Sequence, residues 1–233
     1  MQGILCIDKP IGWTSFDVVN YIRRMIANSE GKRPKTIKVG HTGTLDPFAT
    51  GLLVVLVGKD YTRQASSFSK LDKTYEVTMH LGTTSSTGDP EGQLTAVSKA
   101  VPSIEDIRHC VSKLEGTITQ IPPIYSAVKI QGRRAYQLAR AGKEVILEPR
   151  SVTVHQLTIQ QYAYPEVRLV TNVSSGTYIR SLVESIGQML HTGAYTTELR
   201  RVRIGDFSIE QALQVQNLDI KKLTDLLQSN AAA

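Results

Sequence analysis

Residues 40–57 read GHTGTLDPFATGLLVVLV, a loop rich in Gly and Thr that runs directly into an apolar segment. The apolar part, residues 52–57, is short enough to be a buried strand. Pro47 biases Asp46 away from helical geometry toward an extended backbone, and the glycines of the loop permit tight turns or the close approach of another backbone. The sequence therefore predicts one carboxylate on a stiff loop beside a core strand, presented to a ligand.

Two other interpretations of the Asp46 loop compete with this one. An Asp-Pro pair taken alone commonly does no more than start a turn, and that alternative stays open on the residues alone. A phosphate-binding loop is disfavoured because no Gly-Lys-Ser/Thr follows the glycines. The run Gly58-Lys59-Asp60 comes after the apolar segment, and we expect no helix to follow it.

Composition is that of a folded domain with an excess of positive charge. A chain of 233 residues suits one large domain or two small ones, and its 41% hydrophobic content can supply a sizeable core. The net charge of +6 and the sequence pI near 9.3 favour a polyanionic partner. Many basic proteins bind no nucleic acid, so the charge alone does not identify that partner.

Cysteine and histidine usage predicts neither a metal site nor a disulfide framework. Cys6 and Cys110 lie far apart, no Cys/His spacing is typical of zinc, and the five histidines are scattered singly. The first residues lack the pattern of a signal peptide. No apolar run approaches the roughly 18 residues of a membrane span. We expect a reducing, cytoplasmic setting with no metal and no membrane.

Helix caps and hydrophobic periodicity give a coarse order of elements. Along the chain we predict a strand at 4–7, a helix at about 16–27 capped by Thr14 or Ser15, a polar and basic surface loop at 28–39, a half-buried strand at 75–81, a long loop at 82–92 followed by a short strand, a helix from Ser103 to about Leu114, a hairpin of strands 152–160 and 166–173, a helix at about 178–190, a strand at 199–205, and a last helix at 219–228.

Residues 120–150 have an unusual composition. Basic side chains alternate there with tyrosines and only two glutamates oppose them. Cations suit phosphates and aromatic rings stack on bases, so this pattern favours RNA binding. A solvated, irregular excursion is the alternative.

The loop sequence Gly-His-Thr-Gly-x-Leu-Asp-Pro-x-Ala-x-Gly-Leu-Leu resembles the signature of the TruB family, the bacterial tRNA pseudouridine-55 synthases. Companion motifs of that family follow in the family's order. They are Lys73-x-Tyr75 with Leu81-Gly82, Gly176-Thr177-Tyr178-Ile179-Arg180, and a Pro-Pro-x-Tyr-Ser-Ala-x-Lys-x-x-Gly run at 122–132. An N-terminal Lys-Pro-x-Gly-x-Thr-Ser run at 9–15 is also similar, and on the residues it is a turn followed by a helix cap.

The resemblance implies a mixed α+β class and the pseudouridine synthase fold, in which helices flank a largely antiparallel central sheet. It implies a catalytic domain over residues 1–228 with a mobile, thumb-like insertion at about 120–150 and a tail at 229–233. Family members usually continue into a small C-terminal RNA-binding PUA domain. We expect that domain to be absent from this chain.

By resemblance, uridine becomes pseudouridine when the N1–C1′ bond breaks, the uracil turns, and a C5–C1′ bond forms, without any cofactor. Asp46 is implied as the catalytic carboxylate; attack at C1′, attack at C6 and removal of a 2′ proton all remain open. Arg180 would pair with Asp46 and keep it charged. The remaining positions contact the substrate: Tyr75 would stack on the uracil and assist at C5, Tyr178 and Leu199 would line its pocket, and His41 would fill the gap left by a flipped base.

The implied partner is the T-arm stem-loop of tRNA, bound by a monomer. Two alternatives differ in class or substrate. One is an RNA-binding module, such as a tRNA folding chaperone, that needs no chemistry. The other is a related synthase that acts on another RNA or is guided by an RNA partner.

Overall fold

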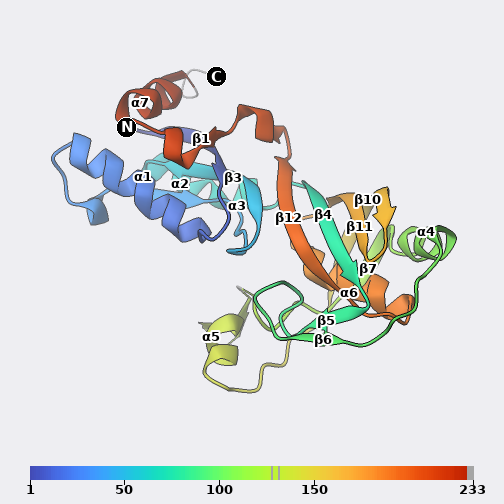
Figure 1. Cartoon of the computed structure of the whole chain (residues 1–233). Coiled ribbons are helices and arrows are strands. Elements are labelled where there is room, and N and C mark those ends of the chain that lie inside the picture. Colours follow the sequence, from blue (N-terminus) through green and yellow to red (C-terminus); the bar gives the residue numbers. More distant parts are fainter. Residues whose placement is uncertain (127, 131, 230–233) are drawn as a thin grey trace. The chain divides into compact units, whose positions relative to one another are not determined.

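The computed structural model describes residues 1–126, 128–130 and 132–229, and it divides into two compact units (Figure 1). Unit 1 comprises Met1–Thr74 and the chain from Arg200 onward, and unit 2 comprises Tyr75–Leu199. Strands β4 (Lys73–Leu81) and β12 (Ala194–Ile204) each contribute residues to both units. Residues 127 and 131 of the thumb-like motif, and 230–233 of the predicted tail, lie outside the described residues.

Unit 1 is built on the strand order β14-β1-β3-β12. Strands β1 and β3 are antiparallel with Ile7 opposite Leu53, whereas β3 and β12 are parallel with Thr50 opposite Arg200. The elements are β1 (Gly3–Lys9), α1 (Ser15–Ser29), η1 (Pro34–Thr36), β2 (Val39–His41), β3 (Thr50–Val57), α2 (Lys59–Arg63), α3 (Ala65–Ser69), β13 (Phe207–Ser208), η2 (Ile209–Gln211), β14 (Leu213–Gln214), η3 (Val215–Asn217) and α7 (Ile220–Ser229).

Helix α1 begins where the sequence predicts. Thr14 is the N-cap, and it forms a reciprocal capping box with Asp17. The apolar face of the helix, which includes Val18 and Ile22, packs on β1 and β3 in one buried cluster. Each such side chain contributes about 1.5–3 kcal/mol by burial, so this cluster holds the first helix to β1 and to β3, the strand that follows the Asp46 loop.

Gly51 allows β3 to approach β12. Its φ is +102°, and a Cβ atom there would lie 2.3 Å from the carbonyl oxygen of Arg201. No side chain fits between the two backbones, and the left-handed φ also favours glycine. The end of the Asp46 loop is therefore fixed against β12.

Unit 2 continues the hydrogen-bonded strand order as β12-β4-β11-β10-β7. The β10–β11 and β10–β7 pairs are antiparallel. Its elements after β4 are β5 (Thr83–Ser85), β6 (Leu94–Ala96), α4 (Ile104–Ser112), β7 (Gly116–Gln120), β8 (Lys129–Ile130), β9 (Arg133–Arg134), α5 (Ala135–Arg140), β10 (Arg150–Ala163), β11 (Glu166–Val173) and α6 (Ile179–Met189). A largely antiparallel sheet flanked by helices confirms the predicted α+β class.

Several local predictions are confirmed and others need correction. Ser103 and Asp106 form the predicted capping box of α4, and β10 and β11 form the predicted hairpin. Residues 82–100 also contain the β5–β6 hairpin. The expectation of no helix after Gly58 was wrong, because α2 starts at Lys59. That helix has five residues and Asp60 follows its lysine, so the residues still do not form a phosphate-binding loop.

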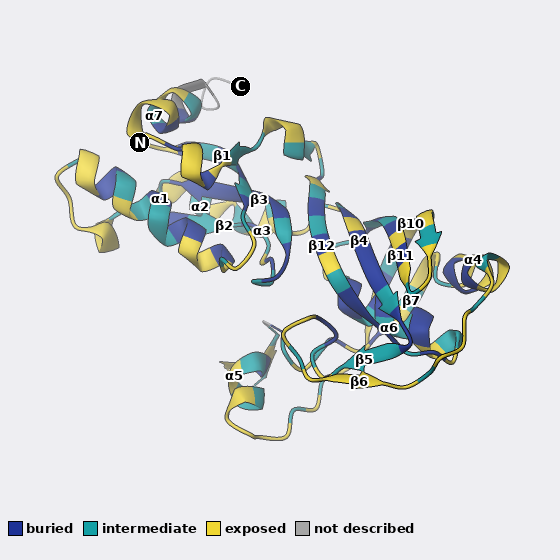
Figure 2. Cartoon of the chain, viewed as in Figure 1, coloured by how far each residue is buried: buried dark blue, intermediate teal, exposed yellow. Residues whose placement is uncertain are grey.

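Strand β4 is more buried than its alternating pattern predicts (Figure 2). Tyr75, Val77 and Met79 are buried as expected, and Thr78 on the opposite face is buried too. The Thr78 hydroxyl donates to the Glu198 carboxylate at 2.9 Å, which satisfies it inside the protein. Within the described residues, no helix has the length and apolar character needed to cross a bilayer.

Candidate active site

Asp46 lies in the loop between β2 and β3, partly exposed, with buried neighbours on both sides. Leu45, Phe48 and Ala49 are all buried. The Ala49 N–H donates to the Asp46 carbonyl at 3.1 Å, which closes a tight turn. The loop thus buries its apolar side chains, while Asp46 stays partly exposed.

Ser15 braces the residue that precedes Asp46. Its hydroxyl accepts the Leu45 N–H at 2.8 Å and donates to the Leu45 carbonyl at 3.2 Å. Ser15 is buried, and Thr14 performs the capping role that the sequence left open between the two. The bracing of the loop by Ser15 was missed, since 30 residues separate the partners and no local pattern indicates it.

Lys9 braces the residue that follows Asp46. Its buried ammonium donates to the carbonyls of Pro10, Trp13 and Pro47, at 2.9, 2.6 and 3.3 Å. The Gly12 N–H also donates to the Pro47 carbonyl at 2.8 Å. The motif at 9–15 is the turn and cap that its residues predict, and it also ties the N-terminus to the Asp46 loop.

Arg180 lies in the first turn of α6 and is only 4% exposed. Its guanidinium donates to the Asp89 carboxylate at 2.9 Å, to the Thr87 carbonyl at 2.7 Å and to the Tyr125 carbonyl at 2.9 Å. A buried charge is tolerated when it is paired and hydrogen-bonded in this way. The guanidinium is therefore buried and not solvated, and the pairing of Arg180 with Asp46 stays a prediction.

Asp89 is a buried partner of Arg180 that sequence reasoning missed. It is 3% exposed, and besides Arg180 its carboxylate accepts the Thr87 hydroxyl at 2.5 Å and the Glu91 N–H at 3.1 Å. One signal was available, because Asp89-Pro90 is the second Asp-Pro pair of the chain. Its long loop otherwise gave no reason to single it out.

Glu184 lies one turn beyond Arg180 on α6 and is partly buried. Burial raises the pKa of its carboxyl, Arg180 opposes that rise, and the charge of Asp89 adds to it. Gly88 packs against this side chain, and a Cβ atom there would lie 2.5 Å from a Glu184 carboxylate oxygen. The loop carrying Asp89 therefore sits directly on α6.

The start of α6 is held by a side-chain amide. Gln120 accepts the Tyr178 N–H at 3.0 Å and donates to the Tyr178 carbonyl at 3.3 Å. Free N–H groups at a helix start can bind an anion, but the Tyr178 N–H is bonded to Gln120. Gln120 thereby fixes the entry to α6 two residues before Arg180.

The other predicted positions fall on well-defined elements. Tyr75 on β4 and Leu199 on β12 are both buried, and their strands are neighbours in the sheet. Tyr178 is the N-cap residue of α6 and is partly exposed. His41 ends β2, opposite Val55 of β3, at the entrance to the Asp46 loop.

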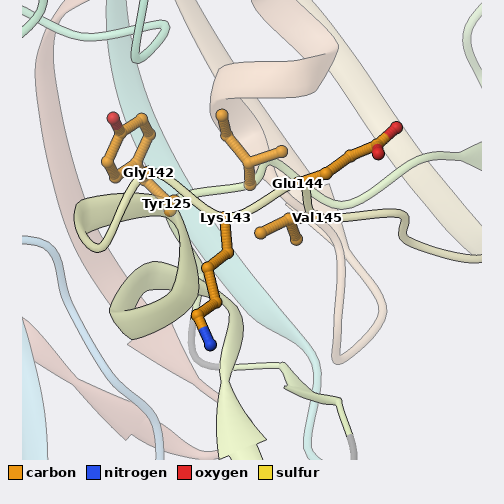
Figure 3. Close-up of a pocket in the computed structure, with 7 residues that line it drawn as sticks. Tyr125, Gly142, Lys143, Glu144 and Val145 are labelled. Atoms are coloured by element: carbon orange, nitrogen blue, oxygen red, sulfur yellow. The ribbon is translucent and has the colours of Figure 1, made fainter.

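The segment 120–150 contains a pocket of about 470 Å³ (Figure 3). It is lined by Ile124, Tyr125, Ala139, Gly142, Lys143, Glu144 and Val145. The backbone of one lining residue, Tyr125, accepts a hydrogen bond from Arg180. The predicted thumb-like segment thus contacts a predicted catalytic residue through its main chain.

Comparison with known proteins supplies the family. Residues 31–179 match the family described as TruB family pseudouridylate synthase (N terminal domain), and residues 180–229 match the tRNA pseudouridylate synthase B C-terminal domain. The chain belongs to the TruB family. The resemblance found in the sequence is confirmed, and so is the predicted enzyme class: the protein is a tRNA pseudouridine synthase, which isomerises uridine to pseudouridine.

Curated relatives match over most of their own length. A protein of Chlamydia muridarum named tRNA pseudouridine synthase B is 42% identical over 94% of this chain and 87% of the relative. One of Thermobifida fusca with the same name is 43% identical over 93% of this chain and 74% of the relative. The TruB family assignment therefore rests on nearly the whole sequence.

A solved Cbf5-Nop10-Gar1 complex contains a chain 30% identical to this one, with a TM-score of 0.70 over 93% of this chain and 53% of that one. A structure described as an H/ACA RNP bound to a substrate RNA is 26% identical with a TM-score of 0.67. This TruB-family chain spans about half the length of those solved chains. The likeness confirms the predicted pseudouridine synthase fold.

Proposed function

We propose that this enzyme converts the position-55 uridine of the tRNA T-loop to pseudouridine and that Asp46 supplies the reacting carboxylate. The observation that carries this assignment is the brace around Asp46. Ser15 holds the preceding residue and Lys9 holds the following one, while Asp46 itself stays partly exposed. Fixing the backbone on both sides of a carboxylate restricts it to a narrow range of positions, which favours reaction.

The chemistry requires an ionised carboxylate and a held base. The N1–C1′ bond breaks, the uracil turns, C5 bonds to C1′ and loses its proton, and N1 gains one, so no atom is gained or lost overall. A carboxylate either forms a transient covalent bond to the substrate or removes a proton from the sugar. Both routes place the same demand on Asp46, which must reach the nucleoside in its charged form.

Residues of unit 2 would hold and polarise the substrate. We assign Arg180 to keep Asp46 ionised, because an adjacent cation lowers the pKa of a carboxyl group. Tyr75 would stack on the uracil, and Tyr178 and Leu199 would line its pocket. The four hydrogen bonds that α6 makes through Tyr178 and Arg180 to Gln120, Asp89 and Tyr125 support these roles, since they limit the movement of the helix start.

His41 would occupy the space left in the RNA when the uridine is extruded. Extrusion costs a few kcal/mol, and a side chain at the mouth of the Asp46 loop could offset part of it. We further propose that residues 1–228 act as one catalytic domain, monomeric and cytoplasmic, with residues 120–150 closing on the RNA as a thumb. The place of His41 between β2 and the Asp46 loop supports its role.

The test is product formation on a T-arm stem-loop RNA, without added metal or nucleotide, by the wild type, Asp46→Ala and His41→Ala. We expect product with the wild type, none with Asp46→Ala although it still binds RNA, and slowed turnover with His41→Ala. Product from Asp46→Ala would refute the assignment of the carboxylate. Equal losses in both variants would refute the division between chemistry and positioning.

Mapping the modified nucleotide in full-length tRNA and in unrelated structured RNAs tests the substrate. Pseudouridine at the T-loop position alone supports the proposal. Efficient modification elsewhere, with none in the T-loop, would identify a synthase of different specificity.

A further inference from the structure

Arg201 is a buried arginine that the reaction chemistry does not use. It lies on β12, is 1% exposed, and is among the largest fully buried side chains of the protein. Its Nε donates to the Leu52 carbonyl at 2.8 Å, and its Nη2 donates to the Gly43 carbonyl at 3.0 Å. These two carbonyls lie on opposite sides of Asp46 in the sequence, so one guanidinium bridges both ends of the loop.

The surroundings of Arg201 do not offset its charge. Among the described residues, no carboxylate lies within ion-pair distance of its guanidinium. Lys73 is a second buried cation nearby, and its pKa falls to about 8 because of burial and, to a lesser extent, the charge of Arg201. Burying a charge without an opposite charge is costly, and an apolar side chain of similar volume is commonly at least as stabilising.

The loop is closely fitted to this side chain. A Cβ atom on Gly43 would lie 3.4 Å from Arg201 Nη1, and one on Gly51 would collide with the Arg201 backbone. The main chain of Arg201 thus pairs with the end of the loop through β3, while its side chain reaches the beginning. Movement of either end would break a hydrogen bond to a buried charged group, which is among the more costly hydrogen bonds to lose.

We propose that Arg201 is a positioning residue. It sets the distance between the two ends of the Asp46 loop and thereby the position of the Asp46 carboxylate. It bonds the carbonyls of Gly43 and Leu52, whereas Ser15 and Lys9 hold the residues next to Asp46. The proposal rests on the assignment of Asp46 as the reacting carboxylate. It differs from a purely structural role because it predicts a loss of rate in molecules that are folded and bind RNA.

The experiment compares Arg201→Met, Arg201→Lys and a matched control, Arg203→Met, which removes an exposed arginine from the same strand. Three quantities are measured for each: the single-turnover rate at saturating T-arm stem-loop RNA, the Kd for that RNA, and the melting temperature. Assays run well below the lowest melting temperature, and rates are expressed per RNA-binding molecule. Asp46→Ala is included as the catalytic reference.

We expect Arg201→Met to slow the saturated rate about 100-fold, the size of effect that a displacement of about 1 Å produces, with Kd within about twofold of wild type. Arg201→Lys should recover part of the rate, because one ammonium can bond one of the two carbonyls. Arg203→Met should keep the wild-type rate at saturation.

A wild-type rate per RNA-binding molecule in Arg201→Met, whatever its melting temperature, would overturn the proposal. If Arg201→Met does not fold, Arg201→Lys decides, and a wild-type rate in that variant overturns the proposal as well. Activity in Asp46→Ala would instead refute the assignment of Asp46. An inactive Asp46→Ala with a fully active Arg201→Met would refute only the positioning role.

Discussion

The two Asp-Pro pairs of this protein share a dipeptide and little else. Asp46-Pro47 in unit 1 leaves its carboxylate partly exposed, and side chains from elsewhere hold the backbone on both sides. Asp89-Pro90 in unit 2 buries its carboxylate, which accepts hydrogen bonds from Arg180, Thr87 and Glu91. One loop is fixed so that its acid remains accessible, and the other is fixed by its acid.

This difference agrees with the role proposed for Asp46. A reacting carboxylate has to reach a substrate, so rigidity must come from groups that bind the backbone around it. A buried carboxylate must have its charge and lone pairs satisfied within the protein, or it destabilises the fold. The same substitution at the two aspartates should therefore affect different properties.

The largest effect is expected from Asp46→Asn, which removes the charge and keeps the shape. We expect the single-turnover rate on T-arm RNA to fall by about 10⁴-fold or more, as when an enzyme loses its nucleophile. The free energy of unfolding should fall less than in Asp89→Asn, because the brace holds the loop through backbone atoms that this substitution leaves in place. Urea unfolding alongside the rate assay checks both, and a large loss of stability would show that Asp46 resembles Asp89 after all.

Asp89→Asn should mainly lower the free energy of unfolding. Arg180 loses its ion pair with the buried Asp89 carboxylate, and breaking a buried pair costs about 3–5 kcal/mol. Equilibrium urea unfolding measures this loss, with Glu105→Gln as the control for removing an acid from an exposed pair, that of Arg108 and Glu105. An unchanged midpoint in Asp89→Asn would mean that the Asp89–Arg180 pair does not hold the loop to α6.

The buried Lys73 side chain lies beside Gly43 of the Asp46 loop. Its effect on the pH dependence of stability can be measured. Its folded pKa of about 8 lies below the ordinary value of 10.5, mainly through burial. Between these values the unfolded chain binds a proton that the folded protein lacks, so Lys73 should make stability rise with pH, by about 3 kcal/mol in total.

Lys73→Met should remove that rise. The measurement is urea unfolding of the wild type and of Lys73→Met at several pH values from 7 to 10.5. The quantity compared is the difference between their free energies of unfolding at each pH. If the free energy of unfolding changes with pH in the same way in the wild type and the variant, burial does not lower the pKa of Lys73 in the folded protein.

The smallest effect is expected from Ser15→Ala, which removes one hydroxyl that serves both backbone groups of Leu45. Loss of these hydrogen bonds should cost about 1–2 kcal/mol of stability and lower the saturated rate modestly. Thr14→Ala is the matched control, since it removes the neighbouring cap of α1 and should cost about 1 kcal/mol with no change in rate below the melting transition. Equal rate losses in both variants would mean that Ser15 acts only through the helix.

Features with local causes could be predicted well. The capping boxes at Thr14 and Ser103 each join residues three apart, and the β10–β11 hairpin joins two neighbouring strands around a short turn. The burial of Thr78 could not be predicted, because its partner Glu198 lies 120 residues away in the sequence. Asp89 was missed for the same reason, since its partner Arg180 is 91 residues away.

The sequence by itself determined the family, the reaction class and the order of the main elements, and it made Asp46 the candidate carboxylate, since each depends on motifs or periodicities along the chain. Only the tertiary structure decided which polar groups meet: Ser15 with Leu45, Asp89 with Arg180, and Arg201 with Leu52 at a separation of 149 residues. Burial makes an unpaired polar group costly, and packing chooses its partner from any part of the chain. That is why the catalytic candidate could be recognised from the linear sequence, whereas the groups that hold it in place could not.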